Sequence, residues 1–499
     1  MPILGCEAHC SGKWLRTFRK KFYTILSGKR SRAKLKGVFM QHESIFRSMA
    51  TIELEDAAMA GINHAKALGA CGAEAFISVS KSRKAKIQNG SLEDLTTSKR
   101  GGIGFRLLRQ GNNGIRIGSA TTTDLSRKCF NDLVEQAWEL SALGDEDPWI
   151  RQGQQEGKDD LPSRYDAGAD ALKPEDRIRL AHALEDAARG ASPKVCAVRE
   201  ATWTDSSGAA LLLTDKGVRT PNIASSCSAT IELAAEWQGD RQAAWHWGVA
   251  RSPQTIDVEA IGREAARKAE EKLNPVQLPA GKYRVLLHPE VTVDLLGIVA
   301  DMLDAESVLK GRSLFANKMG QKIASNVLTL TDDGRLPGGL GSVPWDGEGT
   351  ATRKNVLINE GTLGLYIHNL RTAAEMGAAP TGNASRSTAG NPGVMNFNLF
   401  PKHGEKNPGS LMAQMGDGVL ITELMGLHTV NPVSGDMSVG ASGIRIRNGA
   451  MAESVDRMTF AGNLRDLLLN IVEIGSDLRW YGQSAGATML LDEMTLGGG

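Results

Sequence analysis

The sequence predicts an α+β fold, with a mixed α/β domain over residues 50–275 and a β-rich domain of largely antiparallel sheet over residues 281–499. Two kinds of pattern support this prediction. Apolar residues recur at helical spacing in several separate segments. Short β-branched and apolar runs lie between and after these segments, and several of them meet at Asn-Gly hairpin signals. Helices combined with antiparallel hairpins are typical of an α+β protein.

Length and composition are those of an ordinary globular protein. A chain of 499 residues favours two or more domains, and 41% hydrophobic with 23% charged residues is a usual composition. The net charge of +1 argues against nucleic-acid binding through a basic field. No apolar run approaches the roughly 18 residues that a membrane span needs. The six cysteines show no regular spacing, so we predict a reducing, cytoplasmic location.

Residues 1–48 form a basic extension that differs from the rest of the chain. They hold many lysines and arginines and almost no acids, and the apolar piece at 22–26 is too short for the core of a signal peptide. A disordered tail, an unusual targeting segment and translation from upstream of the true start all fit this composition. We favour the last, with a start near Met40 or Met49.

The elements of the first domain follow from local signals. Helices are expected where an apolar face repeats and a capping residue or a proline opens the segment. Strands are expected where short runs end at glycine-containing turns. In chain order we predict a helix over 51–70, strands over 75–80, 84–88, 104–108 and 115–119, a helix over 124–143, a helix from Pro174, antiparallel strands over 194–250 with turns at 206–208 and 215–217, and a helix over 256–273.

The second domain is expected to open with a strand and a helix and to continue as sheet. The predicted strand covers 283–287, and the predicted helix runs from Pro289 to about Leu309. The later elements that we predict are hairpin turns at 359–361 and 447–449, strands over 419–422 and 444–447, a helix over 464–474 and a strand over 488–491.

The stretch from Gly416 to Gly449 is rich in glycine and other small residues. Side chains this small leave the backbone open to close approach, which suits either a tightly packed corner of a sheet or a bound peptide that pairs with a strand. On the second interpretation, the candidate peptide-binding residues are Gly435, Ser438, Gly440, Ser442 and Gly443.

This stretch and a series of shorter motifs in the same order resemble the TldD/PmbA family of peptidases. The similarity covers about residues 50–499 and is densest in the last 220 or so, where many separate motifs are more specific than any one of them. The matching motifs are Lys86–Glu93, Gly101–Phe105, Asp332-Asp333, Asp346–Thr350, Val356–Gly361, Pro380–Ala384, Thr459–Leu464 and Ile474–Leu478.

The resemblance implies a zinc site in the TldD type of the family, where a strand runs into a helix that carries His-Glu-x-x-x-His. Here His288 stands at the first ligand position, but Pro289 replaces the glutamate base and Val293 the second histidine. Proline cannot accept a proton, and valine cannot bind a metal. The family's later cysteine is also missing, because the last cysteine of the chain is Cys227. We therefore expect no catalytic residue and no metal or other cofactor on this chain.

This degenerate pattern resembles the PmbA (TldE) type, and the resemblance implies a subunit that pairs with a zinc-bearing TldD-type chain. The pair would process extended, unfolded peptides, either by leader removal or by degrading small unstructured proteins. Two alternatives remain open. One is an autonomous metallopeptidase that uses His288, Glu290 and Asp294, and the other is a peptide-binding module without catalysis.

Other polar clusters favour structural interpretations. Four acids, Asp332, Asp333, Asp346 and Glu348, form a cluster that could attract a cation, but we interpret it first as turn chemistry. His246 lies between two tryptophans, and we interpret it as a half-buried sheet histidine rather than a ligand. Serines near His368 lack the glycine pattern of a nucleophile elbow, so a hydrolase triad is not favoured.

Overall fold

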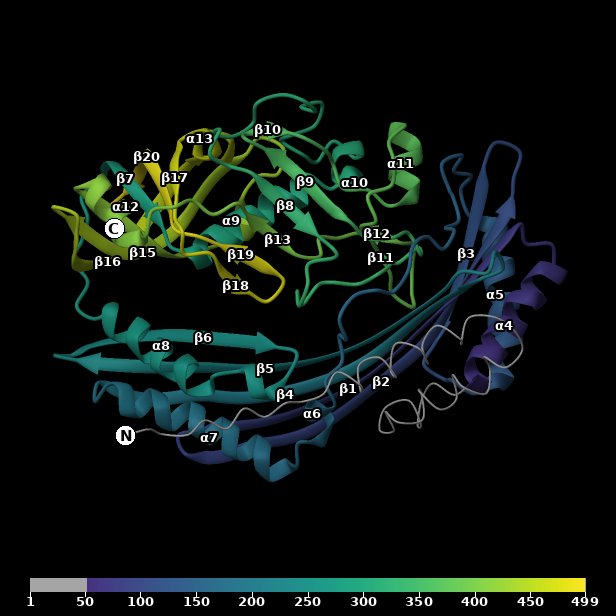
Figure 1. Cartoon of the computed structure of the whole chain (residues 1–499), viewed down its shortest axis with the longest axis horizontal. Coiled ribbons are helices and arrows are strands. Elements are labelled where there is room, and N and C mark those ends of the chain that lie inside the picture. Colours follow the sequence, from purple (N-terminus) through teal and green to yellow (C-terminus); the bar gives the residue numbers. More distant parts are fainter. Residues whose placement is uncertain (1–51, 499) are drawn as a thin grey trace, which may run out of the picture. The chain divides into compact units, whose positions relative to one another are not determined.

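The structure is a computed structural model that describes residues 52–498, and of these residues 54–498 belong to one compact unit. The predicted basic extension, residues 1–48, lies outside the described residues. The α+β prediction is confirmed, because helices and largely antiparallel sheets occur in separate stretches of the chain (Figure 1). Within residues 52–498, every helix is too short or too polar to traverse a lipid bilayer.

The first sheet is antiparallel and follows the order β3-β2-β1-β4-β5-β6. Its strands are β1 (Gly72–Gln88), β2 (Ser91–Gln110), β3 (Ile115–Thr122), β4 (Val195–Thr214), β5 (Arg219–Trp237) and β6 (Asp240–Ala250). The helices that cover it are α4 (Ile52–Ala67), α5 (Phe130–Leu143), α7 (Pro174–Ala191) and α8 (Val258–Glu271) (Figure 1). One apolar core forms under α4 and α5 around Phe105 and Phe130, and a second forms under α7 and α8 around Trp203 and Leu184.

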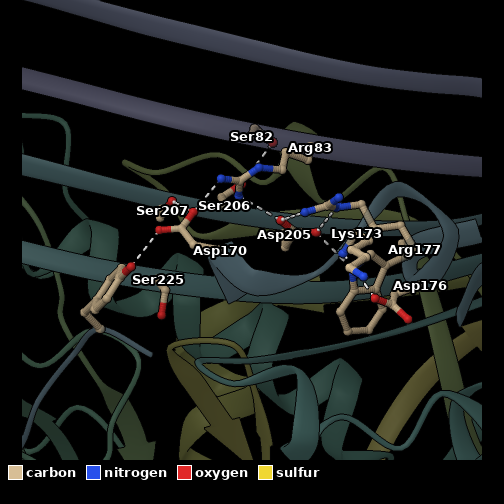
Figure 2. A network of polar contacts seen from close by, with 12 residues as sticks. Ser82, Arg83, Asp170, Lys173, Asp176, Arg177, Asp205, Ser206, Ser207 and Ser225 are labelled. Atoms are coloured by element: carbon tan, nitrogen blue, oxygen red, sulfur yellow. Dashed lines mark hydrogen bonds and ion pairs between the residues drawn. The ribbon is translucent and has the colours of Figure 1, made fainter. Parts of the chain in front are cut away.

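The predicted turn at Ser206–Gly208 is wrong, because β4 continues through it to Thr214. Ser206 and Gly208 pair with Ser82 and Ser80 of β1, and the Ser206 hydroxyl donates to the Ser82 hydroxyl at 2.9 Å (Figure 2). The same pairing merges the predicted strands 75–80 and 84–88 into β1. Small residues that resemble a turn locally therefore serve a cross-strand contact with a partner 124 residues away.

A network of buried charges joins this sheet to its helices (Figure 2). Asp205 of β4 is fully buried; its carboxylate accepts from Arg83 of β1 at 3.0 Å and from Arg177 of α7 at 2.5 Å. Arg83 also donates to Asp170 of the short helix α6 (Ala167–Ala171) at 2.5 Å. Because each arginine contacts an aspartate, the two positive charges are balanced by two negative charges, and every charged side chain in the network stays paired when it is buried.

The second half of the described chain builds two further six-stranded sheets. In the order β16-β15-β14-β7-β20-β17, an additional pairing of β16 with β20 closes five of the strands into a ring. The strands of this sheet are β7 (Gly281–Leu287), β14 (Gly418–Met425), β15 (Asp436–Arg447), β16 (Ala450–Asn463), β17 (Ile471–Ile474) and β20 (Met489–Gly497). The other sheet, β10-β9-β8-β13-β19-β18, contains β8 (Leu330–Asp333), β9 (Lys354–Asn359), β10 (Thr362–Leu363), β13 (Leu399–Pro401), β18 (Arg479–Tyr481) and β19 (Ser484–Gly486).

Two predicted helices are shorter than expected. The segment from Pro289 to Leu309 divides into α9 (Pro289–Met302) and α10 (Ala305–Leu309), because the Asp304 side chain accepts from the backbone N–H of Glu306 at 2.8 Å and caps a new helix. The late helix ends at Leu469 as α13 (Leu464–Leu469). The residues that follow form β17, since they pair with β20.

The hairpin turns predicted at 359–361 and 447–449 are confirmed, with Glu360, Gly361, Asn448 and Gly449 all at positive φ. The strand predicted at 444–447 starts earlier, at Asp436, so Gly440 to Gly443 lie inside β15 and not in a turn. At Gly443 a Cβ atom would lie 2.1 Å from the Leu420 carbonyl oxygen of β14. The small residues of this stretch therefore permit close approach of the neighbouring strand.

Candidate functional site

A pocket of about 540 Å³ lies where β6 and α8 of the first sheet face the start of α9 and the strands beside it. Its lining includes His288 and Pro289, which the sequence singles out, together with residues that it does not single out. The polar and aromatic residues around these two are Trp245, His246, Trp247, Lys268, Glu290, Asp294, Arg479 and Tyr481.

His288 is the N-cap residue of α9. It follows β7 directly, its N–H donates to the Ile421 carbonyl of β14 at 2.9 Å, and its Nδ1 accepts from the N–H of Glu290 at 3.3 Å. Pro289 occupies the first helical position, where a missing N–H is tolerated. Burial lowers the pKa of His288 to about 4, against the raising effect of Glu290, so the ring is neutral at physiological pH.

Glu290 points at an ammonium group. Its two carboxylate oxygens lie 2.6 and 2.5 Å from Nζ of Lys268 on α8, and Oε1 lies 3.3 Å from Nδ1 of His246 on β6. Burial raises the pKa of Glu290, but the hydrogen bond with His246 and the Lys268 charge outweigh it and hold the pKa at about 2. The carboxylate is therefore ionised, and both of its oxygens are occupied.

These residues do not fit a zinc ion. Pro289 and Val293 pack toward β19, where a Cβ on Gly486 would lie 2.2 Å from the Pro289 carbonyl oxygen and 3.0 Å from a Val293 methyl. Across residues 52–498, no three His, Cys, Asp or Glu side chains lie close enough together to hold a metal ion. This includes the alternative set of His288, Glu290 and Asp294. The Lys268 ammonium beside Glu290 would also repel a second cation.

The opposite wall of the pocket is a sheet edge. β6 is the last strand of its sheet, so in the described part of the chain the outer backbone groups of Ala244 to Trp247 have no strand partner. Trp245 is 53% exposed there, although it is one of the largest apolar side chains. An open edge beside the exposed ring of Trp245 suits an extended peptide, which adds main-chain hydrogen bonds and places alternate side chains in the pocket.

The five candidate peptide-binding residues do not gather at this pocket, and only Gly443 lines it. From Gly440 to Ile446, β15 is paired with β14 on one side and β16 on the other, so this part offers no edge for a peptide. Ser442 donates to Asp456 at 2.7 Å, and Ser438 pairs with Ala461. Gly435, at φ +80°, sits in the turn before β15. The role of these five residues in peptide binding stays a prediction.

Lys268 and Tyr481 are pocket residues that the sequence does not single out. Lys268 lies in a run of charges on α8 that is indistinguishable from a solvated helix face. His246 carried a signal, its place between Trp245 and Trp247, and it does lie half-buried in a strand, as interpreted. That signal could not reveal the ion pair with Glu290, because His246 lies in β6 and Glu290 in α9, and only the fold brings these two elements together.

The acidic residues Asp332, Asp346 and Glu348 are buried. Asp346 accepts from the N–H groups of Glu348, Thr350 and Ala384, which agrees with the interpretation as turn chemistry. Glu348 accepts from the N–H of Leu370 at 2.8 Å. Burial raises the pKa of Asp346 to about 6, and burial together with the Asp346 charge raises that of Glu348 to about 8.

Two further motifs have packing roles. A Cβ on Gly104 of β2 would lie 1.7 Å from the Thr388 carbonyl oxygen. The glycine motif at 101–105 therefore leaves room for the loop that contains Thr388 to pack against β2. His368 is buried, and its Nδ1 lies 3.2 Å from Thr372 Oγ1.

Family models match three consecutive parts of the chain. They are described as PmbA/TldA metallopeptidase domain 1 over residues 73–141, the central domain over 168–273 and the C-terminal domain over 280–498. The chain is 26% identical over 432 residues to a protein named Metalloprotease PmbA from Escherichia coli O157:H7, covering 86% of this chain and 92% of that protein. A Metalloprotease PmbA homolog from Haemophilus influenzae is 24% identical, covering 86% of this chain and 93% of that protein.

Solved structures share the fold. A protein of Thermotoga maritima described as a putative modulator of a DNA gyrase superposes with a TM-score of 0.80 at 25% identity, covering 89% of this chain and 99% of that one. TldE from Thermococcus kodakarensis gives a TM-score of 0.80 at 20% identity, covering 88% of this chain and all of that one, which supports the fold alone.

Proposed function

Because the chain belongs to the PmbA/TldD family of metallopeptidases, we propose that it is the PmbA (TldE)-type subunit of a two-chain peptidase and carries no zinc of its own. The single observation that supports this best is the Lys268–Glu290 ion pair beside His288. In the alternative metal site of His288, Glu290 and Asp294, this ammonium group occupies the acid that would have to bind the metal. Pro289 and Val293 support the same conclusion, since neither side chain can serve as a base or a ligand.

In this proposal, a TldD-type partner supplies the zinc and the general base, and this chain supplies part of the wall along which an extended substrate lies. The open edge of β6 and the pocket beside it favour unfolded peptide over folded protein, because only an extended backbone can pair with a strand edge. The proposed setting is the cytoplasm, and the proposed reaction is peptide processing, by leader removal or by degradation of small unstructured proteins.

The test measures metal content and cleavage in parallel. We expect the purified chain to hold far less than one zinc per chain and to leave an unfolded peptide intact. Mixed with a TldD-type chain that carries His-Glu-x-x-x-His, it should form a complex, and the mixture should cleave the peptide. A control mixture in which the motif glutamate of the TldD-type chain is replaced should bind but not cleave. About one zinc per chain, lost in His288→Ala, would instead support the autonomous peptidase.

A second candidate function is peptide binding without catalysis, which the open β6 edge and the exposed Trp245 favour. The same mixtures separate it from the first. A chain that only sequesters peptides would bind a labelled unfolded peptide when alone and would leave the cleavage rate of the TldD-type chain unchanged.

A further inference from the structure

The first half of β2 is an incomplete piece of sheet. β1 covers one edge of β2 along its length, whereas β3 covers the other edge only at Ile103–Gln110. Residues 91–102 therefore have no outer strand partner among the described residues. Nine of the ten residues Ser91–Arg100 are exposed, on both faces of the strand, and they include Leu92 (46%) and Leu95 (45%). A strand this exposed gains little from its own sheet, and an open edge of this length is a template for another strand.

The outward backbone groups on this edge can be assigned. The N–H of Gly111 donates to Gly114 across the β2–β3 turn, so Gly111 and every second residue before it direct their N–H and C=O away from β1. Thr97, Lys99 and Gly101 belong to this set. Proline at Thr97 would thus remove an outward donor without breaking the β1–β2 ladder.

The charges along the edge are self-complementary. Acids come first, at Glu93 and Asp94, and bases come last, at Lys99 and Arg100. Each acid also forms an ion pair with a lysine of β1, Glu93 with Lys86 at 2.9 Å and Asp94 with Lys84 at 2.7 Å. Two antiparallel copies of this edge can pair in two registers. A two-fold axis at Thr97 sets Asp94 opposite Arg100 of the second copy. A two-fold axis at Thr96 sets Glu93 opposite Lys99 of the second copy. Charged edges ordinarily keep strands apart because like charges meet, but this order brings opposite charges together.

Within one chain, the basic end of the edge is not neutralised. Lys99 lies directly opposite Lys81 of β1, and neither Lys99 nor Arg100 has an acid within ion-pair distance among residues 52–498. Like charges directly opposite one another destabilise a strand pair. The acids of a second copy each pair with one lysine of their own β1, and in a dimer they would accept a second cation from this basic end, which would reduce the repulsion.

We propose that the open edge of β2, residues 91–101, is an interface with a second copy of this chain, formed by antiparallel pairing of the two β2 strands. This interface is independent of the pocket and of the proposed peptidase role, because no residue from 91 to 101 lines that pocket.

Sedimentation velocity of the full chain tests this proposal over roughly 1 to 100 µM, the range in which a modest interface becomes populated. We expect a monomer–dimer equilibrium that weakens with added salt. Thr97→Pro should reduce the mass at the highest concentration to that of a monomer while leaving the unfolding midpoint unchanged. Thr97→Ala, which keeps the outward N–H, is the matched control and should still dimerise.

Charge variants test the pairing itself. Lys99→Glu with Arg100→Glu makes the edge acidic, and Glu93→Lys with Asp94→Lys makes it basic. Each double variant alone should be monomeric, and an equimolar mixture should form the dimer again. A wild-type chain that stays monomeric throughout would overturn the proposal, including the case in which the basic extension or a TldD-type chain covers the edge. A Thr97→Pro variant that dimerises like the wild type would also overturn it.

Discussion

Two buried clusters of charged side chains in this protein are built in opposite ways. In the first sheet, Arg83 and Arg177 face Asp170 and Asp205, so that each charge meets its opposite (Figure 2). In the second half of the chain, two carboxyl groups, those of Asp346 and Glu348, lie together, and most of their hydrogen bonds come from backbone N–H groups.

Burial raises the pKa of a carboxyl group in both clusters, but the partners that oppose this effect differ. Burial raises the pKa of Asp170, but hydrogen bonds from Tyr165 and Arg83 outweigh it and lower the pKa. Burial raises the pKa of Glu348 to about 8, and the neighbouring Asp346 charge adds to this, because backbone dipoles do not neutralise a second carboxylate. Asp170 therefore stays ionised when the chain folds, whereas Glu348 takes up a proton when the chain folds near neutral pH.

The largest effect is expected where the balanced cluster loses its central charge. Asp205→Asn should lower the free energy of unfolding by about 3–5 kcal/mol, because Arg83 and Arg177 then stay buried without their common acid. Denaturant unfolding followed by circular dichroism measures the loss. Asp166→Asn, at the N-cap of α6 and outside the network, is the control and should cost far less. Equal losses in the two variants would show that the balance of charge is unimportant.

The acidic cluster should reveal itself through pH. The folded-state pKa of Glu348, about 8, lies above its ordinary value of 4.5, so the stability that neutral Glu348 contributes is complete below about pH 4.5 and is lost as pH rises towards 8. Glu348→Gln cannot ionise, so its melting temperature should fall less than that of the wild type between pH 5 and pH 8. Parallel curves for the two proteins would contradict a raised pKa. In Asp170→Asn the melting temperature should fall between pH 5 and pH 8 as much as in the wild type, because Asp170 is already ionised at pH 5.

The pocket offers an intermediate case. Lys268 and Glu290 form a single pair whose side chains are 17% and 25% exposed. Lys268→Met should lower the free energy of unfolding by about 1–2 kcal/mol and raise the pKa of Glu290, because water replaces only part of the lost ammonium. Lys268→Arg keeps the charge and should lose less. If the methionine variant were as stable as the wild type, this ion pair would contribute as little to stability as an exposed surface pair.

The smallest effect is expected on the surface. Arg447 and Glu453 form a two-point contact at 3.1 and 2.9 Å on an exposed hairpin. Glu453→Gln should leave the unfolding midpoint unchanged within error, because solvent and salt screen such pairs. A clear shift of the unfolding midpoint would contradict the view that exposed ion pairs contribute less to stability than buried ones.

Local signals predicted the elements better than the contacts between them. Helix periodicity and Asn-Gly turns placed α5, α8 and the hairpin at Asn448-Gly449, because each signal lies within one segment. The continuity of β4 through Ser206 was missed, since it depends on β1, far away in sequence.

The pocket shows the same limit. His288, Pro289 and Val293 could be singled out from one short motif. Lys268 could not, and neither could the contact of His246 with Glu290, because only the fold brings α8 and β6 to the start of α9. The charge order of Glu93, Asp94, Lys99 and Arg100 is visible in the sequence, but its meaning depends on an open edge that only the sheet order reveals.

The ring of strands has a consequence for synthesis. β20 pairs with β7, β16 and β17, and its partner β7 lies about two hundred residues earlier in the chain. On a ribosome, β7 emerges long before β20, and the ring cannot close until β20 has left the exit tunnel. The emerging chain must therefore hold β7 with an open edge, exposed to chaperones and to other nascent chains, for most of the time that its second half takes to be made.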